Sequence, residues 1–440
     1  MKRFFVCMVV CVISVLPLFA GGGQGQSSGG AASSGKTEIR AAWWGDTGRH
    51  ELYNRIVDEF QAANPDVVVA REPTSWNDYW DKLSVQAAGG NAPDFMGMHP
   101  QYSADYIPRG VCEPLDAYIA DKTLSTDGWA QGTIDTGKYD GKVYMMAMGV
   151  TFSVSFVNTG LFKELGVTPP AFDWTWEDAR RIGLQVRAAF DRQGKRTSWM
   201  FNDISTSINS WRYFIRQHGR ELYDAKGDIG AQVSDVEEWF TMFKEFRDAG
   251  IVPDAATATE YFNATLEDSL FSRDKILILW VPVNQYKLYS TTFPNKEVSI
   301  IRMQTAPGRS VGEFPEGAHF AVNSRAAPEK KRAAVRLMNF WLNDERSLKI
   351  YGLDQGVPGN LKVGEVIIPA LDQYQLKIVE VVNALSKIGT PTIYPPTGAS
   401  EIDLLFRNFG EQVQFNQKTP AAAAREFYDQ AVAIRARAGK

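Results

Sequence analysis

Cysteine and histidine are scarce in this sequence, which holds three of the first and four of the second among 440 residues. Two of the cysteines, Cys7 and Cys11, lie in an apolar segment near the start of the chain. The remaining Cys112 can form neither an internal disulfide nor a cysteine-rich metal site, so we interpret it as a small buried side chain. The four histidines show no zinc-like grouping. We therefore expect no metal and no cofactor.

The common sequence signatures of enzymes are also missing. There is no GxSxG, no HExxH, no GxxxxGK[ST] and no paired-cysteine motif. Carboxylate pairs that cleave glycosides are spaced in three dimensions and not along the chain, and nothing singles out a pair among 51 acidic residues. We expect no catalytic residue, and a secreted carbohydrate-active enzyme stays as the alternative.

Long apolar runs are absent after the first twenty residues. The chain begins with a short basic segment followed by apolar residues 4–19, which is typical of a secretory signal peptide over residues 1–20. Sixteen residues fall short of the roughly 20 that span a membrane, so an uncleaved anchor is the less favoured interpretation. No cysteine stands at the end of the run, so a lipid anchor is not predicted. We expect a secreted, periplasmic protein.

Residues 21–36 are predicted to be a flexible linker, because 21–35 contain only Gly, Ser, Ala and Gln and bury too little to offset the entropy of ordering. Without Lys2 and Arg3, 45 basic residues face 51 acidic ones, a net charge of −6. This balance disfavours nucleic acid as a partner. The roughly 400 remaining residues exceed one ordinary core, so two lobes are expected.

The next segment reads as strand, helix and strand, over residues 38–42, 49–63 and 67–70. This order and length predict a βαβ unit of a parallel sheet. Ligands of such sheets meet the loops that follow the carboxyl ends of the strands. Two adjacent tryptophans in an extended segment point in opposite directions, so at most one of those at 43 and 44 should face the core.

Aromatic and short polar side chains recur in the loops that follow predicted strands. An aromatic ring stacks on the C–H face of a sugar, and planar polar groups match its hydroxyls. The strand-end positions that combine these features are Trp43, Trp44, Asp46, Trp76, Asn77, Tyr79, His99, Tyr102, Trp280 and Asn284. Trp211, at the irregular approach to a helix, is an equally balanced choice between binding and packing. The pattern favours a carbohydrate ligand.

Residues 140–179 contain two adjoining apolar runs, 143–150 and 152–157, with no loop between them. They predict one long strand that crosses from one lobe to another. Gly166 is placed to end a short helix, and Thr175 with Asp178 forms an approximate capping box for the next one. A cleft is expected at the crossing.

The same stretch resembles the extracellular solute-binding proteins of bacterial ABC importers, in the carbohydrate-binding family that includes maltose-binding protein. The matching residues are Gly141-Lys142-Val143-Tyr144, Met148, Phe156-Val157-Asn158, Leu161-Phe162, Gly166, Pro169-Pro170 and Thr175-Trp176-Glu177-Asp178. Further similar segments lie at 92–98, 269–280, 304–322 and 354–358, so the resemblance extends over about residues 38–440. One departure is Arg273-Asp274, where the family usually has Gly.

The resemblance implies an α/β, two-lobed, periplasmic-binding-protein-like fold of type II, with a ligand cleft between the lobes. It implies three crossings, near 149–152, 266–276 and 318–324. The expected N-terminal lobe comprises 37–150 and 270–320, and the expected C-terminal lobe comprises 151–269 and 321–440. The family varies its contact residues with its ligand, so site residues are implied only as loop positions. These positions add Gly317, His319 and Asp354 to the candidates above.

The implied function is the substrate-binding component of an ABC sugar importer. Such a protein captures a mono- or oligosaccharide by hinge closure and delivers it to the permease subunits in the membrane, and a monomer is expected. The alternative on the same scaffold is a non-sugar solute or a sensor kinase as partner. A carboxylate or phosphate ligand should require Arg or Lys in the strand-end loops, where Arg49 is the nearest.

Overall fold

The structure is a computed structural model that describes residues 35–438 except 225, 263, 265, 267 and 391–394. The predicted signal peptide and residues 21–34 of the predicted linker therefore lie outside the described residues. Within the described part, no helix combines the length and the apolar character that crossing a membrane requires.

A five-stranded sheet, called the first sheet below, has the order β2-β1-β3-β11-β6. Strand β1 pairs in parallel with β2 and β3, whereas β11 runs antiparallel to β3 and β6. Its strands are β1 Thr37–Trp44, β2 Val67–Thr74, β3 Phe95–Met98, β6 Met146–Ala147 and β11 His319–Val322. Helix α1 (Thr47–Ala63) connects β1 to β2 and buries one apolar face, so the predicted βαβ unit is confirmed.

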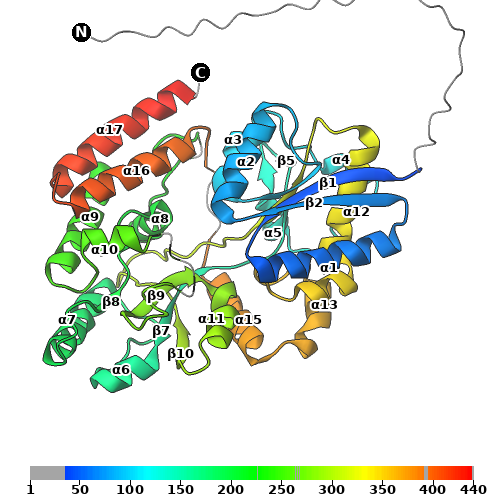
Figure 1. Cartoon of the computed structure of the whole chain (residues 1–440). Coiled ribbons are helices and arrows are strands. Elements are labelled where there is room, and N and C mark those ends of the chain that lie inside the picture. Colours follow the sequence, from blue (N-terminus) through cyan, green and yellow to red (C-terminus); the bar gives the residue numbers. More distant parts are fainter. Residues whose placement is uncertain are drawn as a thin grey trace, which may run out of the picture. The chain divides into compact units, whose positions relative to one another are not determined.

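The helices beside this sheet come from two separate stretches of the chain, within residues 47–106 and 328–351 (Figure 1). They are α1, α2 Trp76–Ala88, α3 Pro100–Tyr106, α12 Pro328–Asn343 and α13 Glu345–Tyr351. Helix α12 contacts β1, β3 and β11, because its apolar face packs Trp341 edge-on against Trp43 and stacks it on Phe95. The core of the first sheet is therefore built around aromatic rings.

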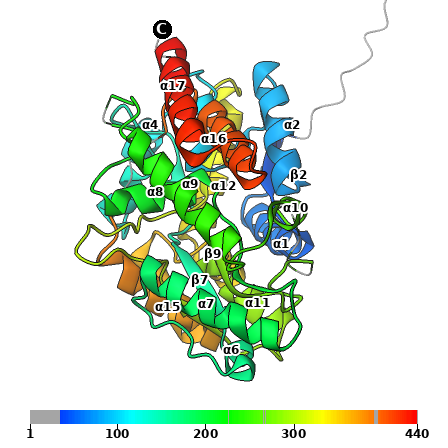
Figure 2. The same cartoon turned by 90° about the vertical axis from the view of Figure 1, so that its left-hand side faces the viewer.

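A four-stranded sheet, called the second sheet, has the order β10-β7-β9-β8. Its strands are β7 Ser153–Asn158, β8 Trp199–Phe201, β9 Ile276–Pro282 and β10 Val298–Ile301. The helices that share its core are α6 Thr159–Leu165, α7 Trp176–Arg192, α8 Ile208–Gln217, α9 Val233–Asp248, α16 Ala399–Gln414 and α17 Pro420–Ala438. Helix α17 packs on α9 and α16 and is seen beside them in Figure 2.

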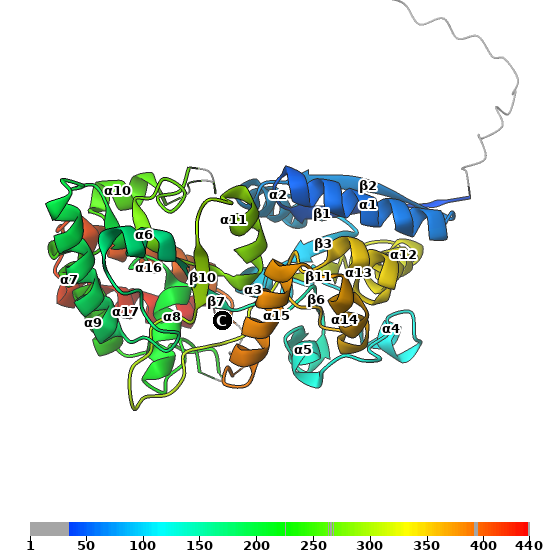
Figure 3. The same cartoon turned by 90° about the horizontal axis from the view of Figure 1, so that it is seen from below.

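The remaining described elements are mostly short, apart from the 14-residue helix α15. They are α4 Asp116–Ala120, α5 Gln131–Asp135, β4 Lys138–Tyr139, β5 Lys142–Val143, α10 Ala255–Glu260, α11 Tyr286–Thr292, α14 Leu361–Ile367 and α15 Gln373–Ser386, with 3₁₀ turns at Val283–Gln285 and Ile368–Ala370. Helix α15 contacts α11, and Figure 3 shows it between the elements of the two sheets.

Local signals were confirmed where backbone geometry decides them. Gly166 ends α6 in the left-handed conformation, with φ of 67°. At α7 the hydroxyl of Thr175 accepts from the backbone N–H of Asp178, whose carboxylate accepts from the backbone N–H of Thr175. This reciprocal cap satisfies two N–H groups that the first turn leaves without partners.

The two sheets confirm a two-lobed α/β fold, but the strand pairing corrects the predicted lobe boundaries. Strands β9 and β10 were expected in the N-terminal lobe, within 270–320, and they pair in the second sheet. Helix α12 was expected in the C-terminal lobe, within 321–440, and it packs on the first sheet. The apolar run 276–281 fits a buried strand of either sheet, so its composition could not reveal that β9 lies between β7 and β8.

The crossings follow from the same pairing. The chain passes from the first sheet to the second between β6 and β7, over 148–152, as predicted. It returns between β10 and β11, which includes the start of the predicted segment 318–324. The predicted crossing near 266–276 is wrong, because β8 and β9 belong to one sheet. The chain instead leaves the first sheet after α13 and reaches the second-sheet core at α16.

Candidate functional site

A cleft of about 1000 Å³ is lined by residues from the elements of both sheets. We call it the central cleft. Its first-sheet wall includes Asp46, Trp76 and Gln101, and its second-sheet wall includes Ser207 and Trp280. The first crossing, which contains Thr151, runs along it. Loops that follow strands in the sequence thus meet at one place, as the strand-end rule predicts.

The first-sheet wall is an aromatic surface. Trp44 ends β1, and Trp76 opens α2 after Ser75 has capped that helix. The Trp76 ring meets Trp44 at 5.0 Å and His99 at 5.5 Å between ring centroids, both edge-on. Trp76 is half-buried, so part of its ring faces the cleft. The backbone N–H of Arg49 donates to the Asp46 carboxylate at 2.8 Å, which positions Asp46 as the cap of α1 at the rim.

The second-sheet wall presents Trp280 from the end of β9. Its ring lies 4.6 Å from that of Phe201, and the buried Nε1 donor has no hydrogen-bond partner among the described residues. Trp76 and Trp280 therefore face the cleft from opposite walls.

Asn284 joins the connecting segments and leaves little of its amide for a ligand. The hydroxyl of Thr151 donates to Asn284 Oδ1 at 3.0 Å, and Asn284 Nδ2 donates to the carbonyl of Asp354 at 2.7 Å. Asp354 in turn pairs with Arg49 at 2.7 Å and accepts from Tyr53 at 3.0 Å. Asp354 lines a groove of about 600 Å³ that adjoins the central cleft, so it lies near the candidate site and serves the contact between segments.

Gly317 lines the cleft for a reason that involves the backbone. A Cβ there would lie 2.2 Å from the carbonyl oxygen of Gly149, a backbone atom that cannot yield. The neighbouring Glu316 pairs with Thr151 in an antiparallel bridge that joins two crossings. The close approach at Gly317 is therefore one between chain segments.

Three predicted site residues lie in the core instead, and this corrects their assignment. Trp43 is 1% exposed and packs on Trp341, Trp211 is fully buried and stacks on Phe406 at 4.8 Å, and the buried Tyr79 hydroxyl donates to the carbonyl of Gly97 at 2.6 Å. Burying a large aromatic ring beneath a helix or sheet stabilises the fold, and at these three positions the ring therefore packs in the core and not at a cleft.

Three others have different outcomes. Tyr102 stacks on Trp80 at 4.1 Å and lines a separate hollow of about 390 Å³ beside α2. His319 is buried in β11 and reaches a smaller pocket described next. Asn77 falls in α2, and its side chain lies outside the described part of the structure.

A smaller pocket of about 160 Å³ adjoins the central cleft, and we call it the inner pocket. The two compartments share the lining residues His99, Gln101, Asn209, Glu316 and Gly317. Arg212 from α8 and Asp403 from α16 complete a set of ionisable side chains in the inner pocket.

Arg212, Glu316 and Asp403 were not among the site residues predicted from the sequence. Two of them directly adjoin residues that were chosen, because Arg212 follows Trp211 and Glu316 precedes Gly317. Successive residues on a helix point about 100° apart, so a Trp211 that faces the core turns Arg212 toward another side. The apolar face of α8 was the available signal. Asp403 carried none, because it stands among several polar residues of α16.

The inner pocket perturbs its ionisable groups. Burial lowers the pKa of Arg212 to about 10, although Tyr223 and Glu316 act in the opposite direction. Burial raises the pKa of the Glu316 carboxyl and that of the Asp403 carboxyl. Burial also lowers the pKa of His99 to about 4 and the pKa of His319 to about 3, so both imidazoles are neutral at pH 7.

Within the described residues, no group of three His, Cys, Asp or Glu side chains is arranged to hold a metal ion. Cys112 is buried, as interpreted from the sequence, and burial raises the pKa of its thiol to about 12. The described site thus offers rings, amides, hydroxyls, the guanidiniums of Arg49 and Arg212, and carboxylates for binding.

Comparison with known proteins identifies the kind of scaffold. A family model described as "bacterial extracellular solute-binding protein" matches residues 55–375. An arabinooligosaccharide-binding protein of Bacillus subtilis is 27% identical over 234 residues, which are 52% of this chain and 51% of that protein.

Two solved structures share the fold. An oligogalacturonide-binding protein of Yersinia enterocolitica, in complex with saturated digalacturonic acid, has a TM-score of 0.79 at 19% identity and covers 92% of this chain and 100% of its own. An ABC substrate-binding protein of Listeria monocytogenes, in complex with cycloalternan, has a TM-score of 0.75 at 23% identity and covers 90% of this chain and 98% of its own.

Proposed function

We propose that this chain, which belongs to the family of bacterial extracellular solute-binding proteins, is the substrate-binding component of an ABC sugar importer. It captures a mono- or oligosaccharide in the central cleft and delivers it to permease subunits in the membrane. The observation that carries this proposal is the pair of half-buried rings, Trp76 and Trp280, on opposite walls of one cleft.

The chemistry of the cleft suits a sugar. Each indole can stack on the C–H face of a pyranose or furanose ring. Hydroxyl and amide groups beside them supply both donors and acceptors, as sugar hydroxyls require. These groups include Gln101, Ser207, Asn209 and Ser210. The volume of about 1000 Å³ stands at the upper end of small-molecule sites, so it favours an oligosaccharide over a single ring.

Closure of the cleft is the proposed mode of capture. The three crossings are the natural hinges, because the described part of the chain passes between the two sheets at these places. Their backbones pair with one another, through Val150 with Val357 and Thr151 with Glu316. Rotation about these segments would bring the two indoles onto the two faces of the same ligand and would exclude water.

The relatives support this role. Those in the comparison include proteins named for oligosaccharide binding and an ABC substrate-binding protein. We further propose a signal peptide over residues 1–20, a periplasmic location, a monomeric state and binding without cleavage of the sugar.

A thermal-shift screen of mono- and oligosaccharides tests the proposal. A ligand that binds only the folded protein raises the unfolding midpoint, and the rise grows with the logarithm of the ligand concentration above Kd. We expect at least one oligosaccharide to do so and to remain intact after prolonged incubation, as judged by chromatography. If no saccharide raises the midpoint, the sugar assignment is wrong. If a saccharide is hydrolysed, the alternative of a carbohydrate-active enzyme replaces it.

A further inference from the structure

The inner pocket brings together three ionisable side chains from distant segments. Arg212 comes from α8, Glu316 from the second crossing and Asp403 from α16. Arg212 is 7% exposed and lies over the Phe314 ring, with 5.2 Å from its guanidinium carbon to the ring centroid. Glu316 accepts from the Ser153 hydroxyl at 2.9 Å. A guanidinium only donates hydrogen bonds and a carboxylate only accepts them, so the pocket offers both donors and acceptors to a ligand.

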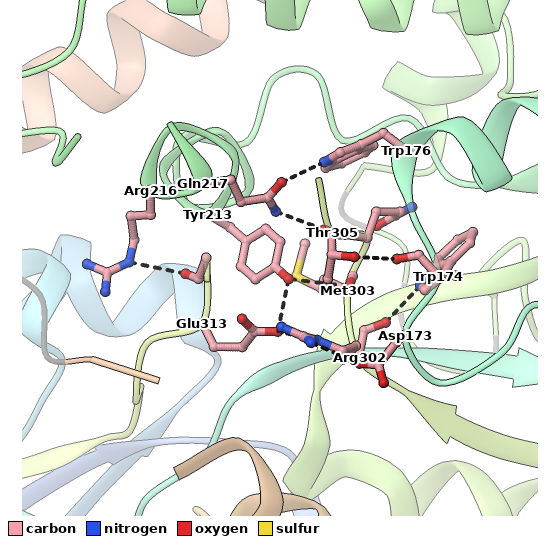
Figure 4. Close-up of polar contacts among 12 residues, drawn as sticks. Asp173, Trp174, Trp176, Tyr213, Arg216, Gln217, Arg302, Met303, Thr305 and Glu313 are labelled. Carbon is pink, nitrogen blue, oxygen red and sulfur yellow. Dashed lines mark hydrogen bonds and ion pairs between the residues drawn. The ribbon is translucent and has the colours of Figure 1, made fainter. Parts of the chain in front are cut away.

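Surrounding contacts hold α8 and the segment before Glu316 in place. Glu313 accepts from the Tyr213 hydroxyl at 3.0 Å and from Arg302 Nε at 2.7 Å (Figure 4). Arg216 Nε donates to the carbonyl of Gly312 at 3.1 Å. Because these bonds tie α8 to residues 302–313, Arg212 and Glu316 are presented to the pocket from rigid supports.

One wall of the inner pocket is made where the elements of the two sheets already touch. Gln101 of α3 donates to Asp403 of α16 at 2.6 Å, and Ser400 donates to Asp105 at 2.5 Å. A ligand chain that entered from the central cleft would pass beside this contact, because Gln101 lines both compartments. The inner pocket is also far smaller than the central cleft, so it admits a short part of such a ligand.

The terminal unit of a saccharide chain is the part that matches this chemistry. An internal unit uses two of its oxygens in glycosidic bonds, whereas a terminal unit keeps one more free hydroxyl. Charge-assisted hydrogen bonds are stronger and more directional than neutral ones. A small pocket that contains a guanidinium and carboxyl groups therefore suits the unit of the ligand that has the most free hydroxyls.

On the premise that the proposed function is correct, we propose that the inner pocket is a terminal subsite. It takes the end unit of a linear oligosaccharide, and Arg212, Glu316 and Asp403 determine specificity by binding the hydroxyls of that unit. The units that follow lie between the indoles of the central cleft.

Titration calorimetry with end-modified trisaccharides tests the terminal subsite. The probes are maltotriose and arabinotriose, each used unmodified, reduced to the alditol at the reducing end, or methylated on the non-reducing ring. We expect one of the two modifications to weaken binding about tenfold or more, because it removes hydrogen bonds to charged groups, and the other to change it about threefold or less.

Substitutions test whether Asp403 and Glu316 cause the preference for one end of the trisaccharide. Asp403→Asn keeps the shape of the side chain, and we expect it to reduce the ratio between the two modified ligands to near one. Glu401→Gln is the matched control: Glu401 lies on the same helix, is exposed and paired with Arg437 at 2.7 Å, and lines neither compartment, so its substitution should keep the ratio. Glu316→Gln provides a second isosteric variant if Asp403→Asn does not fold.

The outcomes separate the two proposals. If the trisaccharides bind and the two end modifications weaken binding equally, the terminal subsite is wrong while the sugar-binding function stands. A ratio unchanged in both Asp403→Asn and Glu316→Gln would exclude these residues as its determinants. If neither these trisaccharides nor any sugar of the thermal-shift screen binds, the proposed function fails first, and the terminal subsite fails with it.

Discussion

The central cleft is lined by three tryptophans, whereas no tryptophan is among the described residues that line the inner pocket beside it. The inner pocket instead adds Arg212, Asp135 and Asp403 to Glu316, which lines both, and the other charged side chains of the cleft are Asp46 and Arg49. Stacking on an indole tolerates small shifts of a sugar along the ring and depends mainly on contact area. Hydrogen bonds to charged groups depend on direction and on the identity of each hydroxyl. On the proposed function, this difference predicts that the cleft contributes most of the affinity and the inner pocket most of the selectivity.

Gly317 belongs to both compartments, and its substitution should give the largest effect. Gly317→Ala would place a Cβ 2.2 Å from the Gly149 carbonyl oxygen and separate two crossings. We expect a loss of about 3 kcal/mol or more in the free energy of unfolding, measured by urea denaturation. Gly132→Ala is the control, because Gly132 lines the inner pocket with no atom within 4 Å of an added Cβ. Equal stability of the two variants would contradict the close approach.

Trp280→Ala should weaken binding in the central cleft and leave the selectivity of the inner pocket unchanged. Loss of one stacking surface should weaken saccharide binding by about 1–3 kcal/mol, by calorimetry, for end-modified and unmodified ligands alike. Phe172→Ala removes an aromatic ring that is 40% exposed and does not line the cleft, so its affinity should match that of the unaltered protein. An unchanged titration for Trp280→Ala would remove this ring from the site.

His319, which lines the inner pocket, should make the stability of the protein depend on pH. Its Nδ1 lies 3.1 Å from the carbonyl oxygen of Gly317, and a carbonyl only accepts, so the neutral ring carries its proton on Nδ1. Burial lowers the pKa of His319 to about 3, so the folded protein favours the neutral ring. Its contribution to stability is complete above the ordinary pKa of about 6.5 and is lost as the pH falls toward 3.

Between pH 7 and pH 4.5, the unaltered protein should therefore lose on the order of 2 kcal/mol more stability than His319→Gln, which cannot take up a proton. Denaturant unfolding at the two pH values measures this difference. Parallel losses in both proteins would show that His319 does not titrate as the structure indicates.

Asp403→Asn should give the smallest change in stability. Burial raises the pKa of Asp403, so its contribution is present at low pH and is lost as the pH rises through the folded-state pKa. The amide removes this loss but also weakens the bond from Gln101, so the net gain at pH 7 should be about 1 kcal/mol or less. The gain of the variant over the unaltered protein should shrink as the pH falls toward 4. A gain that grows in acid would reverse the sign and contradict the assignment.

Much of the fold could be predicted because local signals and distant ones agreed. The unit β1–α1–β2 follows from strand and helix periodicity, and the first crossing follows from two apolar runs without a loop. The sheet that contains β9 could not be predicted, because an apolar run carries no information about its partner strands. The aromatic residues of the site could be predicted only in part, because the position of a tryptophan in the sequence does not show which elements will cover it. Trp44, Trp76 and Trp280 line the cleft, whereas Trp43 and Trp211, with the same side chain, are covered by α12 and α16.

The sequence alone determined the type of scaffold, the place of the strand-end loops and the abundance of rings near them, because these depend on periodicity, on turn residues and on the order of motifs along the chain. Tertiary structure alone decided which ring stays half-buried at a cleft and which charges face it. That decision depends on neighbours brought from far along the chain, as when Arg212, Glu316 and Asp403 meet across 191 residues of separation between the first and the last. Side-chain burial and pKa are properties of that packing, and no single segment contains them.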